Sequence, residues 1–304
     1  MNTTINFLIN QANEIILGKE KQIRLSLACL FARGHLLIED LPGMGKTTLA
    51  QLLARLMGLQ YNRIQFTSDL LPSDIIGAAI YDRDKGEFYF HPGPVFTQVV
   101  LADEINRATP KAQSALLEAM EERQITAEGE TRDLPEPFFV IATQNPTYHT
   151  GTFPLPESQF DRFMMRIELG FPSRQAERSI LTGRDRSILL QTIKPCLTSE
   201  QVLKIQSLVP QVHVSDALLD YLQDLVDFTR NDSSTSNGLS PRGSLALMRS
   251  AQSWAFLDGR DAVIPEDVQI ILPSVVGHRL RQYTDNLSDT SSIAQKLLKS
   301  VAIP

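Results

Sequence analysis

The sequence predicts an α/β protein, in which helices cover both faces of a parallel β-sheet and a smaller all-α domain follows. Three observations favour this fold class. Short apolar runs alternate with helical patterns between residues 35 and 170, and only helical patterns follow residue 172. The length of 304 residues suits one large or two medium domains. Alternating strands and helices are typical of parallel sheets, because the chain must cross over between parallel strands.

Two helical patterns open the chain, and strand patterns follow them. Apolar residues recur at helical spacing over residues 5–16, which Gly18 follows, and again over residues 23–31. Short apolar runs then predict strands at residues 35–40, 61–67, 99–103, 138–143 and 164–169. Helices are expected to begin near Thr47, Pro72, Thr109 and Pro156.

Two stretches interrupt this alternation and read as β-hairpins. Residues 78–90 contain two short strand patterns joined by a turn that ends in Gly86, and residues 124–134 have Gly129 near their turn. Both are expected to be insertions that point away from the central sheet. The first hairpin is rich in aromatic residues. These either face a pore or a partner protein, or pack on the hairpin's own core, as alternating aromatics in a half-buried strand do.

The change of pattern sets the predicted domain boundary within residues 171–190. Residues 1–180 are expected to form the α/β core, and residues 181–304 a C-terminal helical domain.

Composition narrows the function classes. The chain has 29 Lys and Arg against 35 Asp and Glu, a net charge of -6, which argues against a dedicated nucleic-acid-binding protein. Its two cysteines, Cys29 and Cys196, form no CxxC pair and are typical of free thiols in a reducing compartment. The N-terminus lacks the pattern of a signal peptide, and no apolar run reaches membrane-spanning length. These features predict a soluble, cytoplasmic protein without membrane insertion.

A phosphate-binding loop is the strongest motif. The segment Pro42-Gly-Met-Gly-Lys-Thr-Thr48 lies between a predicted strand and a predicted helix. Glycines allow backbone N–H groups to converge on phosphate oxygens, and the helix N-terminus favours an anion. Lys46 would reach the terminal phosphates, and the hydroxyl of Thr47 would bind Mg²⁺. Asp40 stands where the generic motif has its first glycine.

Polar residues end two further strands of the predicted sheet. Asp103 and Glu104 follow the apolar run that starts at Val99, and Asn145 follows the strand at residues 138–143. Ligands of open α/β sheets bind at the carboxyl ends of strands. Asp103 would hold the magnesium shell, Glu104 would orient and deprotonate an attacking water, and Asn145 would sense the terminal phosphate.

Together these segments resemble the AAA+ superfamily, and the MoxR family within it. The resemblance rests on PGMGKT at residues 42–47, LADE at 101–104, ATQNP at 142–146, LPESQFDRF at 155–163 and SPRGSLAL at 240–247. It runs from about Gly18 to the last residue of the sequence. Asp40 in place of the first loop glycine is familiar in this family. The resemblance implies a P-loop NTPase core with a helical lid.

The resemblance also implies a set of site residues. Arg162 matches an arginine finger that reaches the ATP of a neighbouring subunit, and Arg242 a lid arginine that touches the nucleotide of its own subunit. Arg107 matches an interface position. Catalytic roles fall to Lys46, Glu104, Asn145, Arg162 and Arg242. The nucleotide would contact Gly18, Leu41, Pro42, Gly43, Met44, Gly45, Lys46, Thr47, Thr48 and Asp103. Thr47 and Asp103 would hold Mg²⁺, partly through water.

The implied function is ATP hydrolysis by a homo-oligomeric ring, a hexamer in this family, that remodels or activates client protein complexes as a chaperone. A von Willebrand factor A domain protein is an expected partner. Two alternatives stay open at this point. One is a nucleic-acid-acting or chelatase-like motor on the same core, and the other is a nucleotide-dependent assembly switch with negligible turnover.

Overall fold

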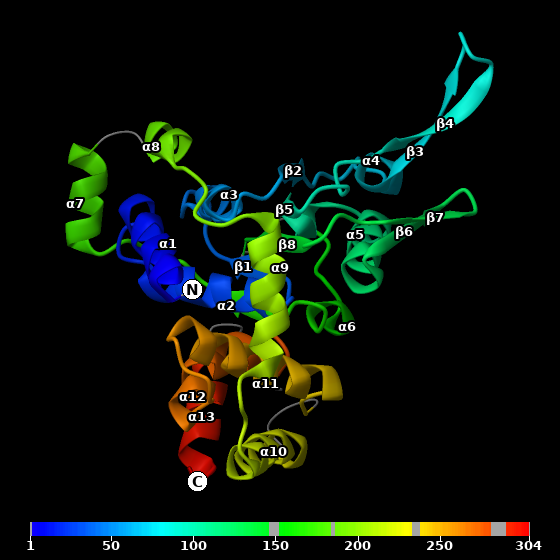
Figure 1. Ribbon diagram of the computed structural model, residues 1–304. Helices are drawn as coiled ribbons and strands as arrows, with labels where there is room; N and C mark the ends of the chain where they lie inside the picture. Colours follow the sequence, from blue (N-terminus) through cyan, green and yellow to red (C-terminus); the bar gives the residue numbers. More distant parts are fainter. Residues whose placement is uncertain (1, 146–151, 184–185, 233–237, 281–289, 304) are drawn as a thin grey trace.

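The computed structural model describes residues 2–145, 152–183, 186–232, 238–280 and 290–303. Among these residues, none of the helices combines the length and apolar character needed to cross a membrane. The α/β part and the C-terminal helices lie one above the other, and two hairpins extend from the α/β part (Figure 1).

A five-stranded parallel sheet forms the centre of the α/β part. Its strands lie in the order β2-β5-β8-β1-β9, and each neighbouring pair is parallel. They are β1 Leu36–Glu39, β2 Tyr61–Gln65, β5 Val99–Asp103, β8 Phe139–Gln144 and β9 Met165–Ile167. Every strand predicted for the sheet is therefore confirmed, and the predicted and observed ends differ by no more than two residues.

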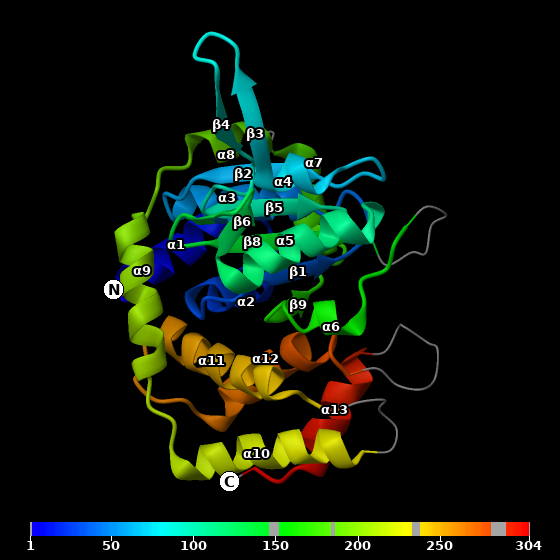
Figure 2. The same cartoon turned by 90° about the vertical axis from the view of Figure 1, so that its right-hand side faces the viewer.

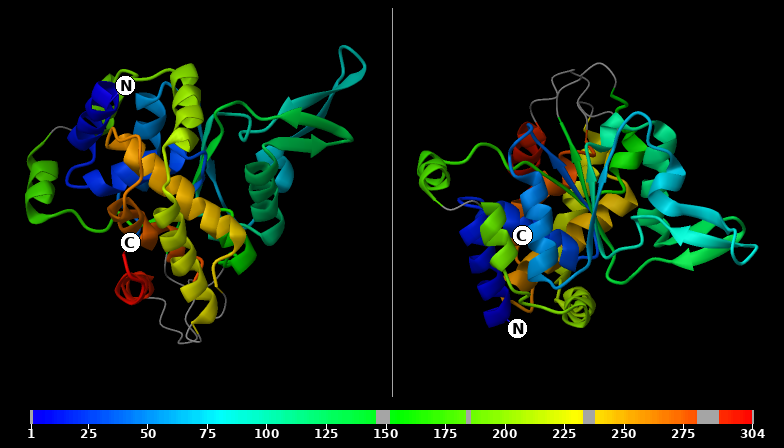
Figure 3. Two further views of the ribbon diagram at one scale, coloured as in Figure 1. Left: turned by 60° about the horizontal axis from the view of Figure 1, so that its bottom comes forward. Right: turned by 90° about the horizontal axis from the view of Figure 1, so that it is seen from above.

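Helices cover both faces of this sheet, as the sequence predicts. Along β5, Val99 and Leu101 belong to one hydrophobic core, and Val100 and Ala102 belong to the other. Successive strand residues point to opposite faces, so each face has its own core. The first core includes helices α1 Asn2–Ile15, α2 Glu20–Phe31 and α3 Lys46–Leu56. The second includes α4 Pro72–Ile76 and α5 Pro110–Glu122, and the sheet lies between the two groups (Figure 3).

Both predicted hairpins are confirmed as two-stranded antiparallel sheets outside the central sheet. The first pairs β3 Gly77–Asp82 with β4 Glu87–Pro92, and the second pairs β6 Gln124–Ala127 with β7 Glu130–Asp133. The first hairpin extends far from the body of the molecule (Figure 2).

The aromatic residues of the first hairpin fall into two groups. Phe90 packs outside its own hairpin, because its ring lies 5.8 Å from that of Phe96 and the guanidinium of Arg132, on the second hairpin, lies 3.9 Å above it. Tyr81, Phe88 and Tyr89 are 51%, 72% and 47% exposed. Within the hairpin, the rings of Tyr81 and Phe88 pack on each other with their centroids 5.1 Å apart, although both side chains stay exposed.

After β9, the residues that the structure describes form helices and their connections, with one isolated bridge between His213 and Ala262. They are α7 Arg174–Thr182, α8 Arg186–Thr192, α9 Ser199–Leu208, α10 Asp216–Asn231, α11 Pro241–Leu257, α12 Pro265–Val276 and α13 Thr290–Ser300. Helix α8 belongs with the α/β part, since Arg186 donates a 2.9 Å hydrogen bond to the carbonyl of Glu14 and Arg55 donates one of 2.9 Å to that of Leu190. The boundary near residue 180 stays a prediction.

One cluster of polar contacts joins the C-terminal helices to the α/β part. The buried Arg279 guanidinium donates to Asp161 Oδ1 at 2.7 Å and to the Phe163 carbonyl at 2.7 Å. Ser240, the N-cap of α11, donates to Asp161 Oδ2 at 2.9 Å. The segment that carries Arg162 is therefore bonded to two separate segments of the helical domain.

Buried His35 predicts a pH-dependent loss of stability. Burial, and secondly the charge of Arg123, lower the pKa of His35 to about 4. Its Nδ1 accepts a 3.0 Å hydrogen bond from the Val140 amide, which suits the neutral ring. The unfolded chain takes up a proton below its pKa of about 6.5, but the folded chain resists until about 4. The free energy of unfolding should therefore fall as pH drops from about 6.5 to about 4, by up to about 3 kcal/mol from this residue.

Urea unfolding at pH 7 and pH 4.5 measures this effect. His35→Gln should flatten the pH dependence relative to wild type, whereas His213→Gln, at an exposed position, should not. An unchanged slope in His35→Gln would show that His35 is not the group that titrates.

Candidate functional site

The glycine-rich loop lies at the carboxyl end of β1 and leads directly into α3. Gly43 and Gly45 have φ angles of 83° and 87°, a conformation that favours glycine. A Cβ added at either residue would meet no other atom within 4 Å, so the space in front of the loop is open. Since α3 begins at Lys46, its free N–H groups and the positive end of its dipole lie beside this open space.

Lys46 lies buried behind the loop. Its Nζ donates to the carbonyls of Asp40 and Leu41 and to Asn145 Oδ1, the last two at 3.2 and 3.1 Å. Burial lowers the pKa of Lys46, against the opposing effect of nearby carboxylates led by Asp40. The ammonium group is thus held at the centre of a polar cluster.

Asp40 has a structural role in place of the expected glycine. Its carboxylate is buried and accepts hydrogen bonds from the amides of Leu41 at 2.8 Å and Gly170 at 2.6 Å. It thereby joins the start of the loop to the segment that follows β9.

Replacing Asp40 by the glycine of the generic motif should destabilise the protein. Asp40→Gly leaves two amides without their acceptor, and we expect a loss of about 2–3 kcal/mol in the free energy of unfolding. Chemical denaturation measures it, with Asp84→Gly at the exposed hairpin tip as a matched control. Equal stability of Asp40→Gly and wild type would contradict this role.

Two carboxylates meet at the end of β5. Asp103 Oδ1 accepts a 2.6 Å hydrogen bond from the Thr143 hydroxyl, and its Oδ2 accepts from Arg63 Nη2 at 2.6 Å. Glu104 has a φ of 58°, which is uncommon for a residue other than glycine and is typical of functional sites. Its amide donates to the Thr143 hydroxyl at 2.9 Å. Thr143 therefore fixes both acidic residues.

Asn145 links the loop to the acidic pair. Its Oδ1 accepts from Lys46, and its Nδ2 donates to Glu104 Oε1 at 3.2 Å. The structure therefore brings Lys46, Asp103, Glu104 and Asn145 together at the carboxyl ends of β1, β5 and β8, where the sequence placed them.

Sequence reasoning missed three residues of this cluster, namely Arg63, Gln65 and Thr143. Arg63 and Gln65 lie on β2, next to β5, and Gln65 is in register with Asp103. Gln65 donates to Glu104 Oε2 at 3.3 Å, and the exposed Arg107 donates to the same oxygen at 2.7 Å. Arg63 and Gln65 could have been found from the sequence, because they are polar residues at the end of a predicted strand and the strand that begins at residue 99 ends in two acidic residues.

Gly18 lies beside the segment that follows β9. It has a φ of 69°, and a Cβ there would approach Ser173 Oγ at 3.9 Å. The neighbouring Lys19 donates a 2.8 Å hydrogen bond to the carbonyl of Phe171. Asp40, at the start of the loop, binds the amide of Gly170 in this same segment. The segment after β9 therefore contacts both Gly18 and the loop.

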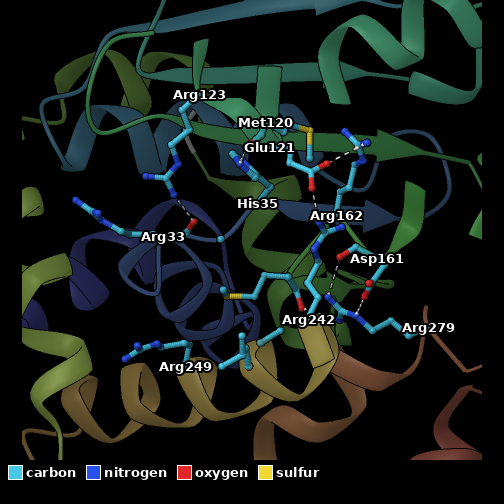
Figure 4. Close-up of a pocket in the computed structure, with 14 residues that line it drawn as sticks. Arg33, His35, Met120, Glu121, Arg123, Asp161, Arg162, Arg242, Arg249 and Arg279 are labelled. Atoms are coloured by element: carbon cyan, nitrogen blue, oxygen red, sulfur yellow. Dashed lines mark hydrogen bonds and ion pairs between the residues drawn. The ribbon is translucent and has the colours of Figure 1, made fainter. Parts of the chain in front are cut away.

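Arg162 and Arg242 lie together near the amino ends of the strands, opposite to the glycine-rich loop (Figure 4). Both pair with Glu121 on α5, Arg162 at 3.0 Å, and Arg162 also donates to the Leu117 carbonyl at 2.6 Å. The Met164 amide, just beyond Arg162, donates to the carbonyl of His35 at the amino end of β1.

The position of Arg242 differs from the expected contact with the nucleotide loop of its own chain. Lys46 donates a hydrogen bond to Asp40 at the carboxyl end of β1. Asp40 is five residues beyond His35, so the two ends of the strand are about 16 Å apart. The physical reason is the packing of α11, whose N-cap Ser240 is bonded to Asp161 beside Arg162.

The donor set around the loop fits Mg²⁺. The described residues contain no group of three or more His, Cys, Asp or Glu side chains placed to hold a metal ion. Mg²⁺ usually takes one or two protein oxygen ligands and completes its shell with waters and phosphate oxygens. The carboxylate of Asp103 and the hydroxyl of Thr47, in the first turn of α3, are ligands of that kind.

Comparisons with known proteins agree with this arrangement. A model of the ATPase family associated with various cellular activities (AAA) matches residues 35–165, and a model of the AAA lid domain matches residues 227–297. The uncharacterized protein YeaC of Bacillus subtilis is 43% identical, over 97% of this chain and 93% of its own. Chaperone MoxR1 of Mycobacterium tuberculosis is 41% identical, over 99% of this chain and 82% of its own. The crystal structure of a candidate ATPase from Cytophaga hutchinsonii superposes with a TM-score of 0.89 and 36% identity, covering 100% of this chain and 96% of that one.

Proposed function

The chain belongs to the MoxR family of AAA+ ATPases, and we propose that it hydrolyses ATP at the interfaces between subunits of a homo-oligomeric ring. The observation that carries this proposal is the hydrogen-bonded chain from Lys46 through Asn145 to Glu104, beside the open glycine loop. A positive group for the phosphates, a polar sensor and a base for water are thus connected.

Each residue of the cluster then has a role in hydrolysis. The amides at Gly43 and Gly45 and the Lys46 ammonium bind the phosphates. Gly18, in the connection between α1 and α2, contacts the nucleotide. Glu104 orients a water molecule and accepts its proton, while Asn145 couples that carboxylate to the terminal phosphate. Thr47 and Asp103 would hold Mg²⁺. When bound, that ion neutralises charge on the phosphate oxygens.

The two arginines at the opposite edge of the sheet support a site shared between subunits. Arg162 and Arg242 lie near the amino end of β1, whereas Lys46 lies at its carboxyl end, so neither arginine reaches phosphates held by Lys46 of the same chain. In a ring with head-to-tail interfaces, that edge of one subunit meets the loop of the next. We therefore assign both arginines to the neighbour's ATP, which revises the expectation that Arg242 acts within its own chain.

The work done by this hydrolysis is chaperone-like remodelling of client proteins, in a ring that we take to be a hexamer. The name of the Mycobacterium tuberculosis relative supports this assignment. A von Willebrand factor A domain protein is the partner we expect. The exposed Tyr81, Phe88 and Tyr89 on the projecting hairpin offer apolar contact area to a client or partner.

Phosphate release at several protein concentrations tests the proposal. Turnover per chain should rise with concentration, because each site is completed by assembly, and it should require Mg²⁺. Lys46→Ala is the control for loop-dependent activity. ATP binding without turnover at any concentration, with or without candidate partners, would favour the assembly switch instead.

A further inference from the structure

Arginine side chains dominate the wall of a cavity of about 360 Å³ at the amino end of the sheet. Residues from α5, from the start of β1 and from α11 line it (Figure 4). Six arginines and two carboxylates, Glu121 and Asp161, belong to this wall, which leaves an excess of four positive charges. The arginines are Arg33, Arg123, Arg162, Arg242, Arg249 and Arg279. In a chain of net charge -6, this is a local reversal of sign.

The arginines divide into a paired and an unpaired set. Arg162, Arg242 and Arg279 form ion pairs with the two carboxylates. Within the described part of the chain, no carboxylate lies at ion-pair distance from the other three. Their hydrogen bonds go to uncharged oxygens, from Arg123 to the Arg33 carbonyl at 3.1 Å, from Arg33 to Gln206 at 3.4 Å and from Arg249 to Gln252 at 3.1 Å.

The fold holds Arg33 and Arg123 close together despite their like charges. Each residue follows the end of a helix, α2 or α5, in the left-handed conformation that is common at helix C-termini, with φ angles of 61° and 54°. Burial and the charge of Arg33 lower the pKa of Arg123, against the smaller opposing effect of the Glu136 carboxylate. The ring of His35, beside them, is neutral near pH 7 and adds no charge. A bound anion would offset the repulsion between these two guanidinium groups.

We propose that this cavity binds a polyphosphate anion on Arg33, Arg123 and Arg249. Guanidinium groups match phosphate oxygens in pairs and remain charged at all working pH values. The cavity volume falls in the range of small-molecule sites. A phosphate chain would supply the negative charge that the unpaired arginines lack. It comes either from a free polyphosphate or from ATP held by a neighbouring subunit. The second source rests on the proposed function, and the first does not.

Binding of inorganic tripolyphosphate to Lys46→Ala protein tests the free source, since this variant removes the lysine of the nucleotide loop. Isothermal titration at fixed ionic strength should show saturable binding. Arg33→Gln or Arg249→Gln added to this background should weaken it about tenfold each, as expected for a charge-assisted contact. Arg178→Gln, at an exposed position on α7, is the control for overall charge. Arg249→Lys should retain part of the affinity.

ATP hydrolysis by variants that keep Lys46 tests whether the phosphate chain comes from ATP held by a neighbouring subunit. If tripolyphosphate does not bind, Arg33→Gln and Arg249→Gln should still lower ATP hydrolysis about tenfold, with fluorescent-ATP binding to the loop unchanged. Absence of both effects would overturn the proposal. If the wild-type chain shows no hydrolysis, the titration alone decides, and absence of tripolyphosphate binding overturns it.

Discussion

Glu104→Gln should reduce ATP hydrolysis by about 10²–10⁴-fold and leave ATP binding intact, the usual effect of removing a general base. Glutamine keeps the size and the hydrogen-bonding oxygen that Asn145 contacts, but it cannot accept a proton from water. Lys46 and the glycine loop, which would bind the phosphates, do not depend on the charge of Glu104. Phosphate release and fluorescent-ATP titration on the same preparation measure the two quantities.

Glu122→Gln is a suitable control, because Glu122 is an exposed residue at the end of α5. It should hydrolyse ATP at the wild-type rate. Turnover of Glu104→Gln within a few-fold of wild type would mean that another group activates the water.

Arg162→Ala should lower turnover by about 10³–10⁵-fold, the range found for arginine fingers in phosphoryl transfer. The loss should appear without a change in ATP affinity, because Arg162 lies at the edge of the sheet opposite to Lys46 of its own chain. Stability should change little, since the pairing of Arg162 with Glu121 is partly exposed and such pairs contribute about 0–1 kcal/mol.

Arg178→Ala serves as the matched control on an exposed helix position. An Arg162→Ala protein that loses ATP affinity at concentrations where the chain is monomeric would contradict the placement of Arg162 in a neighbour's site.

The sequence was sufficient to predict the elements and the loop-side cluster, because those depend on local patterns. Apolar runs flanked by turn residues gave every strand of the sheet, and the glycines of the loop gave its conformation. The carboxyl ends of parallel strands lie at one edge, so the proximity of Asp103, Glu104 and Asn145 to Lys46 followed from topology alone.

Contacts between distant segments could not be predicted in this way. The carboxylate of Asp40 binds the amide of Gly170, 130 residues away, and no local pattern encodes that pairing. The position of Arg242 depends on how α11 docks through Ser240 and Asp161. Helical periodicity shows which face of α11 is buried, but it does not show against which edge of the sheet that helix begins.

The most direct test of a site shared between subunits is ATP hydrolysis by an equal mixture of Lys46→Ala and Arg162→Ala chains. Each variant alone should be inactive, because every interface lacks either the loop lysine or the finger. After mixing, random assortment in a ring should place an intact loop against an intact arginine at about a quarter of the interfaces. Recovery of about a quarter of wild-type turnover is the predicted result. A mixture that stays as inactive as its components, although fluorescence energy transfer shows that the chains have co-assembled, would contradict the shared site.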